Sequence, residues 1–196
     1  MSKLTDLEIK ESIIEAASKL FAQYGYNKTT MEDIAKAVHK GKSTLYYYYK
    51  SKEDVILDIF NKEAISISQK IESSIKNNVS AYERFYTYFQ VISTEGQKVA
   101  NLYNMCRLEL KENYIIQSKF KEIYDDKHIC MLREILTYGV QRREFLSISL
   151  EEVDSVAMLI DKIVLNLVIL ELIEKQNTDW QKSLLMLGNL LNRGLR

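Results

Sequence analysis

Residues 31–48 decide the fold, and they read MEDIAKAVHKGKSTLYYY. The pattern predicts two short helices, over 31–38 and about 42–48, with the tripeptide His39-Lys40-Gly41 between them. Two brief helices joined by a three-residue turn are typical of the helix-turn-helix motif, whose second helix enters a DNA major groove. The sequence therefore predicts a DNA-binding element near the N-terminus.

Helical periodicity continues on both sides of this stretch. Thr5 is expected to begin a first helix and Gly25 to end it. Further Ser/Thr-x-x-Glu/Gln capping boxes begin at Ser80, Ser149 and Thr178. Strand-like alternation does not occur, so the predicted fold class is all-α. The remaining predicted helices span about 52–77, 81–94, 98–112, 115–142, 150–175 and 179–193.

Composition narrows the class of protein. The 196 residues are 46% hydrophobic and 28% charged, as in ordinary globular proteins, and they contain no proline. The 27 basic residues balance the 27 acidic ones, which excludes a uniformly basic chromatin-like protein. Cys106 and Cys130 lack metal or redox spacing, and the most apolar run, 163–173, is shorter than the roughly 20 residues that span a bilayer. We therefore expect a cytoplasmic protein without a membrane partner.

Positive charge is concentrated in one segment. Between Ile34 and Lys52 there are five lysines and no acidic residue, although the first 60 residues carry nine lysines and nine acidic residues. Serine, threonine and tyrosine hydroxyls that can bind phosphates or base edges lie among these lysines. A solvated charged turn beside a tyrosine-rich core is the alternative interpretation.

Three segments carry a resemblance to a known family. Residues 14–26 (IEAASKLFAQYGY), 29–35 (TTMEDIA) and 42–53 (KSTLYYYYKSKE) closely resemble the DNA-binding region of TetR-family transcriptional regulators, over about residues 8–60. The resemblance implies a helix-turn-helix domain of three short helices at 1–51 and a helical ligand-binding and dimerisation domain at 52–196. It also implies a sequence-specific, ligand-relieved repressor that binds a palindromic operator as a homodimer, and not an enzyme. A helical protein-interaction module that has lost specific DNA binding is the alternative.

The resemblance also implies which residues contact DNA. Thr30 would cap the second helix and contact a phosphate, while Lys42 would lie near bases and backbone. Leu45 and Tyr49 match core positions of the family. The implied DNA-binding residues are Thr30, Lys40, Lys42, Ser43, Thr44, Tyr46, Tyr47, Tyr48 and Lys52.

The turn departs from the family pattern, which has Gly-Val-Ser where this chain has His39-Lys40-Gly41. His39 must then take a glycine-like backbone conformation. Lys40 is expected to lay its stem over the core, and Gly41 removes a hydroxyl cap. Because Arg84 is the first arginine in the chain, no arginine in this region can contact guanine. We therefore predict an operator that is A·T-rich at the contacted positions.

Two chemical alternatives are rejected. Gly41-Lys42-Ser43-Thr44 imitates the end of a phosphate-binding P-loop, but position 36 is lysine where that loop needs glycine, and a helix precedes it. His128 and Asp125 have helical spacing for two metal ligands, but a solvated helical face is the favoured interpretation. We predict no catalytic residue, no cofactor and no metal site.

The second half is expected to supply an effector pocket and a dimer interface. Nine aromatic residues lie between Tyr82 and Tyr124. Core packing is the alternative for each of them, but the resemblance implies a cavity for a small apolar or aromatic effector. The predicted pocket residues are Phe89, Tyr103, Cys106, Phe120 and Tyr124. The predicted dimer residues, on the last two helices, are Ile160, Val164, Leu167, Leu184, Leu187 and Leu191.

Overall fold

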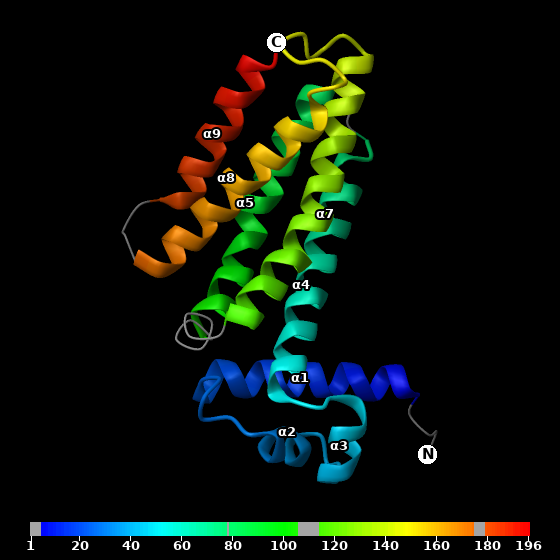
Figure 1. Cartoon of the computed structure of the whole chain (residues 1–196), viewed down its shortest axis with the longest axis vertical. Helices are drawn as coiled ribbons and strands as arrows, with labels where there is room; N and C mark the ends of the chain where they lie inside the picture. Colours follow the sequence, from blue (N-terminus) through cyan, green and yellow to red (C-terminus); the bar gives the residue numbers. More distant parts are fainter. Residues whose placement is uncertain (1–4, 78, 106–113, 175–178) are drawn as a thin grey trace. The chain divides into compact units, whose positions relative to one another are not determined.

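The computed structural model describes residues 5–77, 79–105, 114–174 and 179–196, and within these ranges the chain forms helices and no strand (Figure 1). The predicted all-α fold is confirmed. The helices are α1 (Asp6–Tyr24), α2 (Met31–Ala37), α3 (Lys42–Tyr48), α4 (Lys52–Ile75), α5 (Ala81–Met105), α7 (Tyr114–Gln141), α8 (Val153–Glu174) and α9 (Trp180–Gly194).

The helices form two compact units. The first contains the described parts of 1–62 and 102–121, and the second contains those of 63–101 and 122–196. Helix α4 begins in the first unit and continues into the second. The functional division predicted at residues 51 and 52 remains a prediction.

Local capping sets the helix boundaries of the first unit. The Thr5 hydroxyl accepts from the Glu8 amide at 3.3 Å, and the Glu8 carboxylate accepts from the Thr5 amide at 2.7 Å. Gly25 ends α1 with φ of 85°, a conformation that favours glycine. The predicted start and end of the first helix are confirmed.

One predicted break between helices is wrong, and one predicted N-cap differs by one residue. The helices predicted over 81–94 and 98–112 are continuous from Ala81 to Met105, because an interior glycine such as Gly96 costs only about 1 kcal/mol and burial of its neighbours outweighs it. Helix α9 begins at Trp180 with Asp179 as its N-cap, which accepts from the Lys182 amide at 3.1 Å. The predicted cap, Thr178, lies outside the described residues.

The core of the first unit holds α3 in place. Leu45 of α3 is fully buried, and so are apolar side chains of α1, α2 and α4. Burying side chains of this size contributes about 1.5–3 kcal/mol each. These buried residues are Ile13, Ala17, Phe21, Ile34, Val55 and Phe60.

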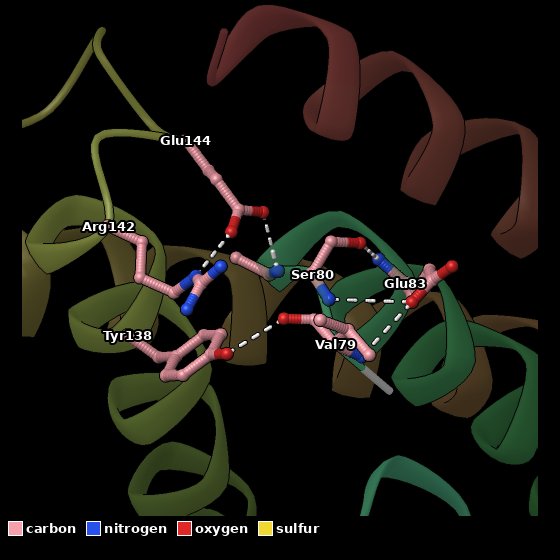
Figure 2. A network of polar contacts seen from close by, with 7 residues as sticks. Val79, Ser80, Glu83, Tyr138, Arg142 and Glu144 are labelled. Carbon is pink, nitrogen blue, oxygen red and sulfur yellow. Dashed lines mark hydrogen bonds and ion pairs between the residues drawn. The ribbon is translucent and has the colours of Figure 1, made fainter. Parts of the chain in front are cut away.

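A polar network fixes the start of α5 to the C-terminal end of α7 in the second unit (Figure 2). The Tyr138 hydroxyl donates to the Val79 carbonyl at 2.8 Å. The Glu144 carboxylate accepts from the Ala81 amide at 2.7 Å and from Arg142 Nε at 2.8 Å. Helix α9 approaches α5 at Gly188, where a Cβ atom would lie 2.6 Å from Cγ of Phe89.

A polar cluster lies inside the second unit. Tyr88 Oη lies 3.3 Å from Nδ1 of His128, and both residues are buried, as is Asp161. Burial lowers the pKa of His128 to about 4, and burial together with the charge of Asp161 raises the pKa of Tyr88 well above its ordinary value. The solvated face favoured for His128 is therefore wrong, because the side chain packs inward beside Tyr88.

The buried imidazole predicts a specific pH dependence of stability. Between pH 6.5 and about 4 the unfolded chain binds a proton at His128 that the folded chain does not. The stability that depends on neutral His128 is thus complete above pH 6.5 and is lost as the pH falls toward 4, by about 3 kcal/mol. Urea unfolding of His128→Asn across this range should show a shallower pH dependence than the wild type. Parallel pH profiles for the two proteins would contradict this.

Candidate nucleic-acid interface

The turn before α3 has the conformation that the sequence requires. His39 has φ of 53°, which confirms the predicted glycine-like conformation. The Lys40 amide donates to the Ala35 carbonyl at 2.9 Å, which closes the turn after α2. Gly41 is the N-cap of α3 and supplies no side-chain hydrogen bond. The turn therefore forms without the family's usual residues.

Helix α3 presents one buried and one exposed face. Leu45 and the following Tyr49 are buried, which confirms that they are core residues. The Tyr49 hydroxyl donates to Oδ2 of Asp58 on α4 at 2.6 Å, and burial with this bond raises the pKa of Tyr49. The start of α3 is exposed at Lys42 and Ser43.

The predicted DNA-binding residues differ in exposure. Tyr47 is 70% exposed and Tyr46 is 38% exposed, whereas Thr44 and Tyr48 are half-buried. Thr30 is exposed at the start of α2 and forms the predicted cap, because its hydroxyl accepts from the Asp33 amide at 3.1 Å. The contacts of these residues with DNA remain predictions.

Tyr48 already has an acidic partner. Its hydroxyl donates to Oδ1 of Asp6 in the first turn of α1 at 2.7 Å. This hydrogen bond to a carboxylate raises the pKa of Tyr48 to about 12. A phosphate contact by Tyr48 would therefore require this bond to break or to be shared.

Lys52 has a structural role that the sequence did not indicate. Its ammonium donates to the carbonyls of Tyr26 at 2.7 Å and Thr29 at 2.9 Å, and lies 4.1 Å from the centre of the Tyr26 ring. These contacts tie the start of α4 to the loop between α1 and α2. The geometry fits a connection within the protein better than the predicted phosphate contact.

Removing the Lys52 ammonium should destabilise the protein. We expect Lys52→Met to lower the free energy of unfolding by about 2–3 kcal/mol, because two charge-assisted hydrogen bonds are lost. Lys50→Met is the matched control, since the exposed Lys50 lies between α3 and α4 and, among the contacts described, its ammonium donates to one carbonyl, that of Tyr46 in α3. Equal effects of the two substitutions in urea unfolding would contradict the role of Lys52.

Lys40 lies on the α1 side of the unit. It lines a surface groove of about 490 Å³ together with Ser12, Glu15 and Lys19 of α1, and it is half-buried. This position agrees with a stem laid over the core. Its predicted contact with DNA remains a prediction.

Sequence reasoning missed an acidic residue at the start of α3. Oε2 of Glu32, on α2, lies 3.9 Å from Nζ of Lys42, and both side chains are more than half exposed. The basic segment between Ile34 and Lys52 contains no acidic residue, and Glu32 lies just before it. Its spacing from Lys42 becomes a contact only when the turn folds α3 back on α2.

The predicted dimer residues need correction. Ile160, Val164 and Leu184 are buried within a single chain, so they cannot form a surface for a partner. The residues Leu167, Leu187 and Leu191 are half-buried. Helices α8 and α9 pack side by side (Figure 1), and each also carries apolar side chains that remain exposed. On α9, Met186 and Leu190 lie one turn apart and form an exposed apolar stripe, and on α8 the exposed apolar residues are Met158 and Leu159.

The predicted pocket is described at one position only. Phe89 is buried, and its ring centre lies 5.2 Å from that of Phe85 and 5.4 Å from that of Tyr88. Cys106 lies outside the described residues, and so do the side chains of Tyr103, Phe120 and Tyr124. Phe89 packs in an aromatic core, and the pocket remains a prediction.

The described residues show no group of three metal-ligating side chains. Within the same ranges, no helix is long and apolar enough to cross a membrane. The described residues show a short helix, α3, that follows a tight turn. One face of α3 is exposed, and the other packs on the core formed with α1, α2 and α4. This arrangement defines a helix-turn-helix DNA-binding protein.

Comparison with known proteins identifies the family. Residues 13–59 match the family model described as bacterial regulatory proteins of the tetR family. Over 136 residues the chain is 31% identical to the fatty acid metabolism regulator protein of Bacillus subtilis, an alignment that covers 67% of this chain and 68% of that protein. The chain belongs to the TetR family, and it is a DNA-binding transcriptional regulator, not an enzyme.

Two further similarities extend beyond the helix-turn-helix motif. The negative transcriptional regulator of the biofilm operon icaADBC from Staphylococcus aureus, IcaR, is 28% identical over 142 residues, which cover 64% of this chain and 75% of that protein. The crystal structure of the transcriptional regulator FadR from Bacillus subtilis in complex with stearoyl-CoA superposes with a TM-score of 0.66 at 24% identity. That superposition covers 95% of this chain and 99% of that one, so the two share the fold.

Proposed function

We propose that this regulator is a repressor that binds a palindromic operator as a homodimer and leaves it when an effector binds. The exposed start of α3 on a buried core is the observation that carries this proposal. The lysine, serine and tyrosine side chains there offer both base contacts and phosphate contacts. The similarity to a negative regulator supports repression.

The exposed apolar residues of α8 and α9 support the proposed dimer. Met158, Leu159, Met186 and Leu190 are each between 44% and 63% exposed in the single chain. A second copy of the chain, related by a two-fold axis, could pack its own α8 and α9 against these residues. The exposed apolar residues of both copies would then be buried. Two recognition helices related by that axis match the two halves of a palindrome.

The effector we propose is a small molecule that carries an apolar or aromatic group, and this group binds in the second unit. Buried aromatic side chains in this unit, such as Phe85 and Phe89, can surround an apolar group. The similarity to the fatty acid metabolism regulator of Bacillus subtilis, and to the FadR structure from the same organism with stearoyl-CoA, supports a long acyl chain as the apolar group. The place of action is the cytoplasm, where operator DNA and acyl-CoA esters are both available.

The effector can be tested with a fluorescent operator duplex. Titration of the DNA-bound protein with stearoyl-CoA should lower the anisotropy, whereas coenzyme A alone at the same concentration should leave it unchanged. A ligand shifts the equilibrium between the DNA-bound and the released shape of the protein only by the difference in its affinity for these two shapes. Release of the operator should therefore reach a plateau as the ligand concentration rises. No release with acyl-CoA esters of several chain lengths would remove this ligand class from the proposal.

A further inference from the structure

We infer that Glu32 is a specificity-determining residue, whose carboxylate accepts a hydrogen bond from a base amino group in the operator. The amino group is N4 of cytosine or N6 of adenine, the donors that the major groove displays. This inference rests on the proposed operator binding and adds to it a residue that carries the charge opposite to the phosphate-binding lysines.

Glu32 lies beside the start of α3, the recognition helix. Glu32 is the second residue of α2, and its Oε2 lies 3.9 Å from Nζ of Lys42, the first residue of α3. In a helix-turn-helix motif the first residues of the second helix meet the base edges. A carboxylate at this distance from Lys42 therefore reaches the same part of the groove.

Glu32 has no part in capping α2. Asp33 performs that task, since its carboxylate accepts from the Thr30 amide at 2.9 Å and from the Thr30 hydroxyl at 2.6 Å. Among the contacts described, the carboxylate of Glu32 meets only the Lys42 ammonium, and the side chains are 57% and 59% exposed. A pair this exposed adds little to folding stability. The larger effect of the Glu32–Lys42 pair is on the binding of a DNA group that approaches Lys42.

The ion pair of Glu32 and Lys42 can distinguish a base edge from a phosphate. Each base pair presents a carbonyl acceptor beside an amino donor in the major groove, at G·C and at A·T alike. Lys42 can donate to the carbonyl while Glu32 accepts from the amino group. A phosphate offers acceptors only, so the Glu32 carboxylate is repelled there and has no donor to compensate it. Glu32 thus lowers the affinity for all DNA and regains affinity at the correct base pair.

The test compares Glu32→Ala with Glu11→Ala. Glu11 is the matched control because it is as exposed as Glu32 (58% against 57%), and its Oε1 lies at the same 3.9 Å from a lysine Nζ, that of Lys62 on α4. Dissociation constants are measured for an operator duplex, taken from selection with the wild type, and for an unrelated duplex of the same length. The ratio of the two constants cancels any effect of net charge.

For Glu32→Ala we expect tighter binding to the unrelated duplex and a smaller ratio. The ratio should fall about fivefold per half-site, or about 25-fold for the dimer, whereas Glu11→Ala should leave it unchanged. Selection from random duplexes should lose its preference at one symmetrical position, and the base lost there identifies cytosine or adenine. A ratio within twofold of the wild type would overturn the inference. A wild-type protein that does not discriminate at all would instead overturn the proposed operator binding.

Discussion

Replacing Lys42 with alanine is expected to weaken operator binding by roughly 30-fold or more. Lys42 is the exposed first residue of α3 and has the only charged side chain in that helix. A base contact from such a residue contributes about 1–3 kcal/mol, and a dimer makes the contact twice. The same substitution should relax the base preference at one position of each half-site.

The control for Lys42→Ala is Lys62→Ala, which removes the same charge from α4. The Lys62 ammonium lies 3.9 Å from Glu11 and 3.6 Å from Glu15, within the first unit and away from α3. Anisotropy titrations at several salt concentrations distinguish the outcomes. Equal, salt-dependent losses for both variants, with the base preference intact, would mean that Lys42 acts only through its charge.

Leu190→Glu should convert the dimer to a monomer and weaken operator binding by about 100-fold or more. Leu190 is 57% exposed on α9, one helical turn from Met186, in the stripe that we assign to the dimer interface. A carboxylate on the two-fold interface would be buried beside apolar side chains without a partner. A monomer contacts one half-site at a time, whereas a dimer gains affinity because its two recognition helices are linked. Affinity for the operator falls because this gain is lost.

Leu146→Glu is the control for this substitution. Leu146 is 70% exposed in the segment between α7 and α8, so the same change of side chain occurs outside the stripe. Sedimentation at micromolar concentration should show a dimer for this variant and a monomer for Leu190→Glu. A dimer in both cases would place the interface elsewhere on the protein.

The sequence predicted the helix-turn-helix motif well because local interactions decide it. Thr5 and Thr30 cap helices through residues three positions later, and Gly25 ends α1 by its own backbone conformation. The unusual conformation of His39 followed from its place in the turn. Leu45 and Tyr49 were identified as core residues from the family pattern, and both are buried.

Properties that depend on distant contacts were not predicted. Helix α8 is apolar on several faces, so its sequence does not show which face a single chain covers. The structure covers Ile160 and Val164 and exposes Met158 and Leu159. The contact between Tyr48 and Asp6 joins residues 42 positions apart, and nothing in either local sequence indicates it.

Specific recognition of a palindrome is the central claim, and selection of binding sites from a random duplex library tests it most directly. The purified protein is used at physiological salt, because phosphate contacts alone dominate at low salt. We predict an enriched inverted repeat that is A·T-rich at the contacted positions. Retention of DNA that is weak, sensitive to salt and without a common motif would contradict the claim, and would favour a helical interaction protein that contacts only phosphates.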